Sequence, residues 1–269
     1  MAPFEGDVDW REARPEDYDL VVFVCGPFEI KSYEAEFLHR FRRNRVIGIN
    51  LSLNQSPQEW NPFDCLLERD SPSSARPEMA FAGNTPRVPV VGVCLVEDYP
   101  AGHTRKAHAQ VRALLDRHDL VSVPIDTRLD QNQFGLRSKS EVESLIARMD
   151  AVVTTRLHGM VLAIKNGVPA VSIDPKWAGG KLVKQAQTIG WPVCFSVDNL
   201  ELGKLDEALQ FCLSPQAREL AKSCAGQALV QLETVKEELA KAVRSQALDT
   251  DPDLKKRSME KLKELISGD

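Results

Sequence analysis

The most constraining stretch of the sequence is residues 150–181, DAVVTTRLHGMVLAIKNGVPAVSIDPKWAGGK. It predicts a buried strand over residues 150–154, a helix over 157–165, a second strand over 170–173, and a glycine-rich turn into another helix. The first helix ends at Asn166-Gly167, because glycine readily adopts the positive φ that follows many helices. A strand, a helix and a strand in this order indicate a unit of parallel sheet.

The alternation of strand and helix extends well beyond this stretch and sets the fold class. Further strands are predicted over residues 88–96, 120–125 and 193–196. Further helices are predicted over residues 104–118, 141–148 and 181–189. Strands that alternate with helices form a parallel sheet with right-handed crossovers, so we expect an α/β protein.

The first part of the chain shows the same pattern over a shorter length. Strands are predicted over residues 19–25, 46–53 and 63–67, and a helix over residues 32–43. The run DLVVFVC at 19–25 is largely apolar, which indicates a strand buried on both faces. About three strands are too few for a complete Rossmann domain of roughly six strands, so we expect a shortened α/β domain.

A change in composition marks a boundary between two domains. Residues 71–88 are rich in Pro, Ser, Ala and Arg, which is typical of an interdomain linker, although residues 76–82 could form a short helix. We therefore predict a shortened N-terminal domain over residues 1–86 and a Rossmann-type domain over residues 87–213. Residues 214–269 are predicted to form C-terminal helices that close the fold or contact a second subunit.

Composition and charge argue against several classes of function. The net charge of -5 provides no general basic surface for nucleic acid, and no apolar run approaches the roughly 18 residues of a membrane span. The first residues are acidic and lack the apolar core of a secretion signal, so we expect a cytoplasmic protein. None of the 6 cysteines forms a CxxC pair, which indicates small buried side chains in a reducing compartment and no metal site.

The candidate site lies where the two strands of the opening stretch end. Arg156 and His158 follow the first strand. The second strand is followed by basic residues and glycines, namely Lys176, Gly179, Gly180 and Lys181. Ligands of open α/β sheets bind at the carboxyl ends of strands, and helix N-termini there favour negative charge. The pattern therefore predicts an anion site for a phosphate or a carboxylate.

The residue types suggest separate roles within this site. Arg156 offers a planar fork for an anion, and His158 can donate a proton near neutral pH. The glycines would let backbone N–H groups approach oxygen atoms. His103 could also approach a ligand, although an ordinary strand-to-helix turn explains it as well. The sequence has no GxxxxGK[ST], GxGxxG, HExxH or GxSxG motif, so P-loop, dinucleotide, zinc and serine-hydrolase chemistry lack support.

One block of the sequence resembles a known family. VVTTRLHGMVLAIKNGVPAVSIDPK resembles the signature block of the polysaccharide pyruvyl transferases, in which an Arg-Leu-His triplet opens a helix and an Asp-Pro-Lys-like step follows the next strand. Weaker similarities are found in DYDLVVFVCGP, FDCLLERDSPSS and VPVVGVCLV. The resemblance covers residues 18–195 or thereabouts.

The resemblance implies a GT-B-like fold, with two Rossmann-type parallel-sheet domains and the active site in the cleft. It implies transfer of a pyruvyl group from phosphoenolpyruvate to a sugar hydroxyl, forming a ketal, in polysaccharide biosynthesis and without a cofactor. Arg156 and His158 would bind the donor's phosphate or carboxylate, with His158 as the general acid. Lys176 would neutralise donor charge, and Arg69 with Asp70 would face the cleft from the first domain.

Two features depart from the family pattern, and two other functions remain open. Cys25-Gly26-Pro27 replaces a glycine-rich run, and the first domain is shortened. A GT-B-like glycosyltransferase that uses a nucleotide sugar is an alternative, because an anion site at a strand end serves a diphosphate equally well. A non-catalytic binding protein that retains the fold is another. The expected partners are phosphoenolpyruvate and a saccharide acceptor, and a homodimer is possible.

Overall fold

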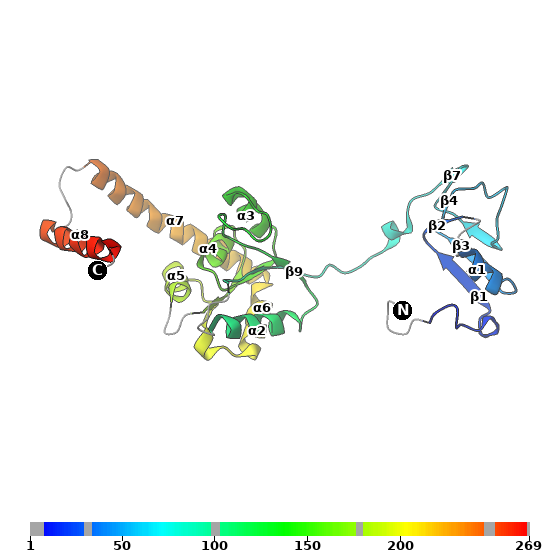
Figure 1. Cartoon of the computed structure of the whole chain (residues 1–269), viewed down its shortest axis with the longest axis horizontal. Helices are drawn as coiled ribbons and strands as arrows, with labels where there is room; N and C mark the ends of the chain where they lie inside the picture. Colours follow the sequence, from blue (N-terminus) through cyan, green and yellow to red (C-terminus); the bar gives the residue numbers. More distant parts are fainter. Residues whose placement is uncertain (1–7, 30–33, 98–102, 176–179, 245–250, 268–269) are drawn as a thin grey trace. The chain divides into compact units, whose positions relative to one another are not determined.

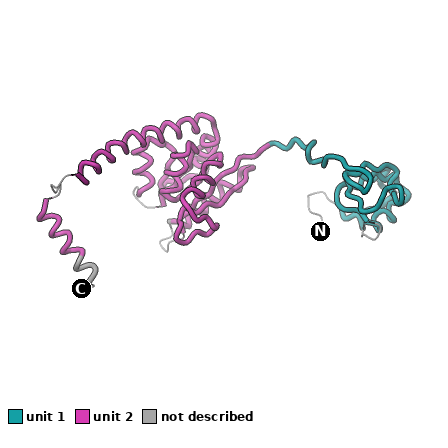
Figure 2. The backbone as a smooth tube through the Cα atoms, turned by 90° about the horizontal axis from the view of Figure 1, so that it is seen from above, with its two compact units in different colours: residues 1–86 teal, residues 87–269 magenta. Residues whose placement is uncertain are grey.

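The computed structural model describes residues 8–29, 34–97, 103–175, 180–244 and 251–267. The chain divides into two compact units, residues 1–86 and residues 87–269, which Figure 2 distinguishes by colour. Each unit has its own sheet structure and its own hydrophobic core. The two units are therefore described separately.

Unit 2 is built on a five-stranded sheet in which every neighbouring pair of strands is parallel. The strand order is β12-β11-β10-β8-β9. The strands are β8 (Val90–Cys94), β9 (Val121–Pro124), β10 (Ala151–Thr154), β11 (Ala170–Asp174) and β12 (Cys194–Ser196). Figure 1 shows them alternating with helices, and the predicted α/β class with a parallel sheet is confirmed.

Two groups of helices pack on this sheet. The connecting helices are α2 (His103–Leu115), α3 (Lys139–Ile146), α4 (Leu157–Lys165), α5 (Lys181–Ile189) and α6 (Leu202–Cys212). Helix α4 contacts α3, α5, β10 and β11, whereas α2 contacts α6. The crossovers β8–β9 and β9–β10 run in opposite directions along the sheet. Right-handed connections therefore place α2 on one face and α3 and α4 on the other.

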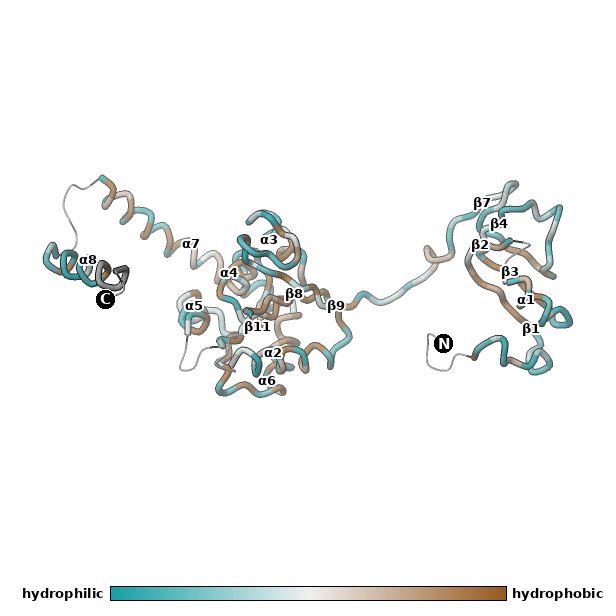
Figure 3. The backbone as a smooth tube through the Cα atoms, in the orientation of Figure 1, coloured by the Kyte–Doolittle hydropathy of each residue, from teal (hydrophilic) through white to brown (hydrophobic). Residues whose placement is uncertain are grey.

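The central strands form the middle of the core. Every residue of β10 and of β11 is buried, as the continuous apolar and β-branched runs predict. Their side chains pack with those of the helices on both faces, among them Met160, Ile164 and Leu209. Figure 3 shows the same concentration of hydrophobic residues along the strands of this unit.

The order of the strands creates a switch point between β8 and β10. These strands are neighbours in the sheet, yet the chain leaves β8 toward β9 and leaves β10 toward β11, in opposite directions. The chain therefore continues in opposite directions along the sheet after these two strands. Switch points of this kind, at the carboxyl edge, are where open α/β sheets bind their ligands.

The chain ends in helices α7 (Pro215–Arg244) and α8 (Pro252–Ser267). The first half of α7 packs on α4, α5 and α6 and buries Ala217, Ala221 and Cys224. The second half of α7 carries a set of exposed apolar side chains: Leu229, Val230, Leu232, Val235, Leu239 and Val243. Among the residues described, no helix combines the length and the apolar character that crossing a membrane requires.

Unit 1 contains two small sheets and one α-helix in its described part. The first sheet has the order β1-β3-β5 and the second has the order β2-β4-β6-β7. The strands are β1 (Leu20–Val24), β2 (Pro27–Phe28), β3 (Arg45–Ile49), β4 (Ser52–Leu53), β5 (Cys65–Leu67), β6 (Asp70–Ser71) and β7 (Ser74–Ala75). The helices are α1 (Glu34–Arg40) and the 3-10 turns η1 (Pro15–Asp17) and η2 (Met79–Ala82), with a third turn, η3 (Val197–Asn199), in unit 2.

The prediction that residues 19–25 form a strand buried on both faces is wrong in one respect. The strand is observed as β1, but Leu20, Val22 and Val24 are exposed. Val21 and Phe23, on the other face, pack against the core of unit 1. The described part of this unit forms a core on one face of the sheet only, so the apolar run is half-buried.

The single strand predicted over residues 46–53 is interrupted. Asn50 adopts a φ of 58°, which leaves the β region and separates β3 from β4. Its buried side chain hydrogen-bonds the sulfur of Cys25 at 3.2 Å and the carboxylate of Glu78. Both partners are distant in sequence, so a local pattern could not reveal the break.

The segment predicted as a linker contains regular structure. Residues 70–75 form an antiparallel hairpin of β6 and β7, and the short helix expected over residues 76–82 is the 3-10 turn η2. The cysteines also differ from the prediction of general burial. Cys94, Cys212 and Cys224 are buried, whereas Cys25 is exposed and Cys65 and Cys194 are half-buried. The burial prediction therefore holds for the cysteines packed in the core of unit 2.

Candidate functional site

The candidate site lies at the carboxyl edge of the sheet of unit 2, around the switch point. Because the strands are parallel, the residues that follow β8, β9, β10 and β11 meet at this edge. They include Glu97 after β8, Asp126 after β9, Arg156 after β10 and Asp174 at the end of β11. The site thus combines charged residues from four separate segments.

The side chains of two threonines form hydrogen bonds that join the segments on either side of the switch point. The hydroxyl of Thr154 donates to the carbonyl of Cys94 at 2.8 Å and accepts from the backbone N–H of Arg156 at 3.0 Å. The hydroxyl of Thr155 accepts from the backbone N–H of Val96 at 2.8 Å. These bonds hold the chain that follows β10 against the chain that follows β8. They explain why polar threonines end an otherwise apolar strand.

Helix α4 begins directly beside this junction. Arg156 is its N-cap residue, and the Arg156 side chain makes no capping hydrogen bond. Gly159 in the first turn lies against Thr154, and a β-carbon there would meet the Thr154 hydroxyl at 2.3 Å. The glycine of the Arg-Leu-His-Gly sequence therefore lets the start of α4 approach the sheet. No side chain in the described part of the chain caps the first N–H groups of α4, and these groups carry the positive end of the helix dipole.

Arg156 is held in a fixed position and is largely buried. Its Nε donates to the carbonyl of Leu95 at 2.7 Å, and its Nη2 lies 2.8 Å from Glu97 Oε1 and 3.5 Å from Asp126 Oδ1. Only 13% of its side chain is exposed. The arginine predicted to bind an anion therefore already contacts two carboxylates.

Glu97 connects Arg156 to a second arginine. Its Oε1 also lies 3.1 Å from Nη1 of Arg128, which in turn contacts Asp130. A hydrogen bond with the Glu97 backbone, followed by those from Arg156 and Arg128, holds the pKa of Glu97 below its usual value despite partial burial. Glu97 is therefore ionised at neutral pH and acts as the shared anion between two guanidinium groups.

Asp126 is the fixed acid of the cluster. Its side chain is 4% exposed, and its two oxygens accept backbone N–H groups from Arg128 at 2.9 Å and Gln133 at 3.2 Å. These bonds shape the segment after β9 and orient the carboxylate toward Arg156. Asp126 thus compensates the buried charge of Arg156, which would be costly without a partner.

His158 is placed differently from Arg156. It is the second residue of α4 and its side chain is exposed. Within the described residues, its imidazole has no hydrogen-bond or ion-pair partner. A histidine with its ring free in solvent beside a helix N-terminus can exchange a proton with a bound ligand.

Asp174 satisfies the start of the neighbouring helix. It is 1% exposed, and its Oδ2 accepts the backbone N–H groups of Leu182 at 2.9 Å and Val183 at 3.2 Å. These two donors of α5 are therefore not available to a ligand. Of α4 and α5, α4 is the one whose first N–H groups have no side-chain acceptor among the described residues.

The remaining predicted residues of unit 2 are placed only in part. Gly180 is the N-cap residue of α5, and Lys181 is the exposed first residue of that helix. His103 is the first residue of α2, and its side chain lies outside the described part. Lys176 and Gly179 lie outside the described residues.

Arg69 and Asp70 belong to unit 1 and contact each other. Arg69 Nε lies 3.2 Å from Asp70 Oδ2. A hydrogen bond from Ser52, followed by that from Arg69, holds the pKa of Asp70 below its usual value. The pair is therefore charged and partly neutralised within its own unit.

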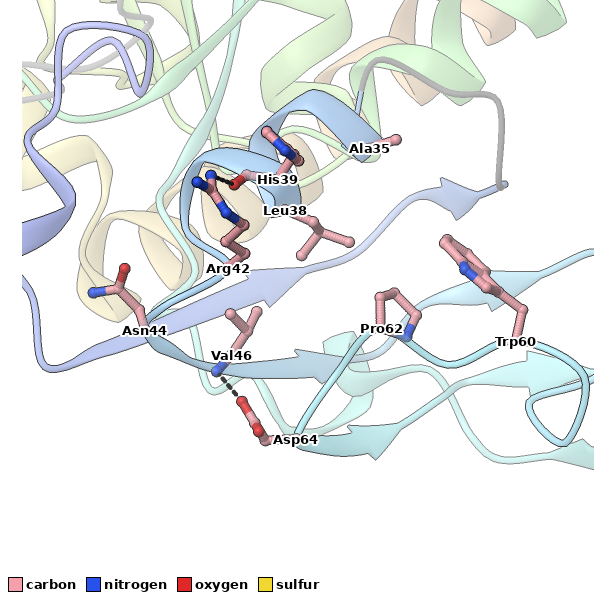
Figure 4. Close-up of a pocket in the computed structure, with 9 residues that line it drawn as sticks. All are labelled: Ala35, Leu38, His39, Arg42, Asn44, Val46, Trp60, Pro62 and Asp64. Atoms are coloured by element: carbon pink, nitrogen blue, oxygen red, sulfur yellow. Dashed lines mark hydrogen bonds between the residues drawn. The ribbon is translucent and has the colours of Figure 1, made fainter.

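Figure 4 shows a cavity in unit 1 that contains none of the predicted residues. Its volume is about 340 Å³, and its polar lining includes His39, Arg42 and Asp64. Arg42 donates to the backbone carbonyl of His39 at 2.8 Å, and Asp64 accepts from the backbone N–H of Val46 at 2.7 Å. The Arg42 and Asp64 side chains therefore stabilise the local backbone.

The sequence patterns identified Arg156 and His158 but missed Glu97, Asp126 and Arg128. Each of these follows a predicted strand within a few residues, in loops that showed no motif. The available signal was an acidic residue directly after each apolar run, Glu97 after Val96 and Asp126 after Ile125. Their pairing with Arg156 depends on the strand order, which the local sequence does not specify.

Comparison with known proteins identifies a family for part of the chain. Residues 126–176 match the model of a family described as polysaccharide pyruvyl transferase. The matched segment begins at Asp126 and contains Arg156, His158 and Asp174, but not Glu97. The match confirms the resemblance over this segment and indicates a transferase of polysaccharide biosynthesis. No curated protein gives a significant match.

Proposed function

We propose that this chain, whose residues 126–176 match the polysaccharide pyruvyl transferase family, transfers the pyruvyl group of phosphoenolpyruvate to a saccharide. The product is a ketal formed with two sugar hydroxyl groups. The matched segment contains Arg156 and His158, which carry the proposed chemistry. Their position at a switch point of the sheet is the observation that supports the proposal most strongly.

The donor is a small, highly charged molecule with a phosphate and a carboxylate. Arg156 supplies a buried guanidinium, which suits planar anions. The start of α4 supplies N–H groups without a side-chain cap, and these suit phosphate oxygens. The two features are adjacent in the chain because Arg156 is the N-cap residue of α4. They therefore form the donor site in our proposal.

The reaction requires one proton donor and a means of stabilising positive charge at carbon. The methylene carbon of the donor takes up a proton, which leaves an oxocarbenium-like centre at the carbon that bears the phosphate. One sugar hydroxyl adds to this carbon and the phosphate leaves. The second hydroxyl then adds to the same carbon and completes the ketal. The two hydroxyl groups release two protons: one replaces the proton that the acid gave to the methylene carbon, and the other leaves with the phosphate. His158 is the proposed acid, since its imidazole is exposed beside the proposed donor site.

Other residues are assigned supporting roles within the same proposal. Lys181, together with Lys176, Gly179 and Gly180, would neutralise or contact donor oxygens from the next strand end. Arg69 and Asp70, in unit 1, would bind the substrate. These roles follow from the family resemblance and from the chemistry of the side chains.

A binding experiment separates the candidate functions. Thermal stability is measured for the full chain with phosphoenolpyruvate, and separately with UDP- and GDP-sugars. Phosphoenolpyruvate is expected to raise Tm, and phosphate release with saccharide acceptors is expected to follow. A rise only with nucleotide sugars would replace the proposal by a glycosyltransferase. No response to any of these compounds would support a binding protein that retains the fold.

The role of His158 is tested by replacing it with alanine. Because the side chain is exposed, His158→Ala should leave Tm within about 2 °C of the unmodified chain while phosphate release falls by at least about 100-fold. Lys184→Ala, an exposed change on α5, is the matched control and should retain full turnover. Normal turnover of His158→Ala would exclude this histidine from the reaction.

A further inference from the structure

The contact between Glu97 and Arg156 joins the two sides of the switch point. Glu97 follows β8 on one side and Arg156 follows β10 on the other, and their side chains meet at 2.8 Å. A carboxylate of the protein therefore lies on the guanidinium that the proposed function assigns to the donor. An anion that binds Arg156 must therefore displace this carboxylate or share the guanidinium with it.

We propose that Glu97 holds the place on Arg156 that the donor's carboxylate takes, so that the donor binds by exchange with Glu97. The inference rests on the proposed function and adds to it a residue that determines which anions are accepted. An anion that binds Arg156 must match the interaction that a glutamate carboxylate already makes. A planar carboxylate on the donor meets this condition.

The fixed position of Arg156 requires the carboxylate to move instead. The Arg156 Nε is bonded to the carbonyl of Leu95 and its side chain is almost enclosed, so the guanidinium cannot swing toward solvent. Asp126 is held by two backbone N–H groups and is nearly fully buried. Glu97 is 35% exposed and is the one of these two acids that can leave.

Arg128 provides a second partner for the displaced carboxylate. Glu97 Oε1 already lies 3.1 Å from Arg128 Nη1, and the Arg128 side chain is 34% exposed. When Glu97 separates from Arg156, it can keep its contact with Arg128. Breaking a buried ion pair is usually costly because it leaves a buried charge without a partner. In this exchange, each charge keeps a partner.

The charge of the cluster explains the expected effect on affinity. It contains two guanidinium groups, of Arg128 and Arg156, and three carboxylates, of Glu97, Asp126 and Asp130. The carboxylates exceed the guanidinium groups by one, which disfavours a multiply charged donor. Replacing Glu97 by glutamine removes one negative charge and leaves a neutral amide, which competes less strongly for Arg156, so the site should bind anions more tightly.

The test compares affinities for phosphoenolpyruvate and for inorganic phosphate by titration calorimetry. Glu97→Gln is expected to lower the Kd for phosphoenolpyruvate by about tenfold relative to the unmodified chain. Glu219→Gln, which removes the same charge from an exposed position on α7, is the matched control and should leave Kd unchanged. Arg128→Gln is expected to raise the Kd, because the displaced Glu97 carboxylate then lacks the Arg128 guanidinium as a partner.

The outcomes distinguish failure of the exchange from failure of the proposed function. Equal or weaker binding of phosphoenolpyruvate by Glu97→Gln, with normal binding by the unmodified chain, would overturn the exchange while the proposed function stands. No binding of phosphoenolpyruvate by any variant, with phosphate bound more tightly by Glu97→Gln, would overturn the proposed function and, with it, exchange with a donor carboxylate. If neither anion binds to any variant, both proposals fail.

A second substitution tests the exchange if the first variant does not fold. If circular dichroism shows that Glu97→Gln does not fold, Glu97→Asp takes its place. The aspartate keeps the charge but is one methylene shorter, so it contacts Arg156 less closely. Tighter binding of phosphoenolpyruvate by at least about threefold is expected for it as well, and an unchanged Kd would count against the exchange.

Discussion

Gly159 lies so close to Thr154 that no larger residue fits between α4 and the end of β10. A β-carbon at position 159 would be 2.3 Å from the Thr154 hydroxyl and 3.1 Å from the sulfur of Cys94. The same hydroxyl bonds the carbonyl of Cys94 and the backbone N–H of Arg156. The glycine is therefore required by the contact that positions Arg156, and a substitution there should disturb both the fold and the site.

Gly159→Ala should lower the free energy of unfolding by about 1–3 kcal/mol, because α4 or Thr154 must move. Urea unfolding measures the change. Gly226→Ala in α7 is the control, since a β-carbon there meets no atom within 4 Å, and it should be neutral or stabilising by up to about 1 kcal/mol. Thr154→Ala should lower the free energy of unfolding less in the Gly159→Ala variant than in the unmodified chain, because it removes the hydroxyl that clashes with the new β-carbon. If the effects of the two substitutions on the free energy of unfolding were strictly additive, they would argue against a contact between residues 154 and 159.

Asp174→Ala should destabilise the chain by at least about 2 kcal/mol, because it leaves two backbone N–H groups of α5 without their acceptor in a buried position. Glu201→Ala is the matched control at the start of α6. The Glu201 side chain makes no capping hydrogen bond, so its loss should change stability by less than about 0.5 kcal/mol. Similar values for the two variants in urea unfolding would show that Asp174 does not stabilise α5.

The cysteines should react with thiol reagents according to their burial. Burial raises the pKa of Cys212 to about 12, and burial together with Asp174 does the same for Cys194. Their thiols therefore stay protonated and unreactive at pH 8. Cys25 is exposed and should account for the fast phase of labelling by Ellman's reagent. Cys25→Ser should remove that phase, and a fast phase that persists would contradict the burial pattern.

The same shifts predict how stability depends on pH. A thiol whose pKa is raised by folding stabilises the folded chain fully below the ordinary thiol pKa of about 9. Above that pH the unfolded chain loses its thiol proton while the folded chain keeps it. The free energy of unfolding should therefore fall as pH rises from about 9 toward 12, and fall less steeply in Cys212→Ala. Urea titrations at several pH values measure this slope, and identical slopes would refute the effect for Cys212.

The second half of α7 should contribute little to the stability of unit 2. Its buried residues, Ala217, Ala221 and Cys224, all lie in the first half. A chain that ends after residue 231 should therefore keep its Tm within about 2 °C. A fall of more than about 4 °C would show that the exposed apolar side chains beyond residue 231 are covered by a partner in solution. Sedimentation of the two forms would then show whether that partner is a second copy.

The sequence was a good guide where the physical causes are local. The bounds of α4, residues 157–165, were predicted without error, because an apolar helix follows a buried strand and ends at Asn-Gly. Burial of β10 and β11 also followed from their composition. These features depend on the preferences of neighbouring residues. A single sequence records such preferences directly.

The sequence was a poor guide where distant segments decide. The break at Asn50 depends on Cys25 and Glu78, which approach it only in the folded unit. The pairing of Arg156 with Glu97 depends on β8 lying beside β10 rather than at the edge of the sheet. The prediction therefore identified a basic site but not its acidic partners. It consequently missed the two carboxylates that contact Arg156.

The carboxylate of Asp174 also has an evolutionary consequence. Strand β11 and helix α5 are joined twice, once through the peptide chain and once through the hydrogen bonds of this side chain. The second link holds the helix in register with the strand whatever residues lie along the first. Substitutions and small insertions between positions 175 and 180 should therefore be tolerated with little loss of stability. The sequence of that stretch can therefore change while the sheet beside it stays the same.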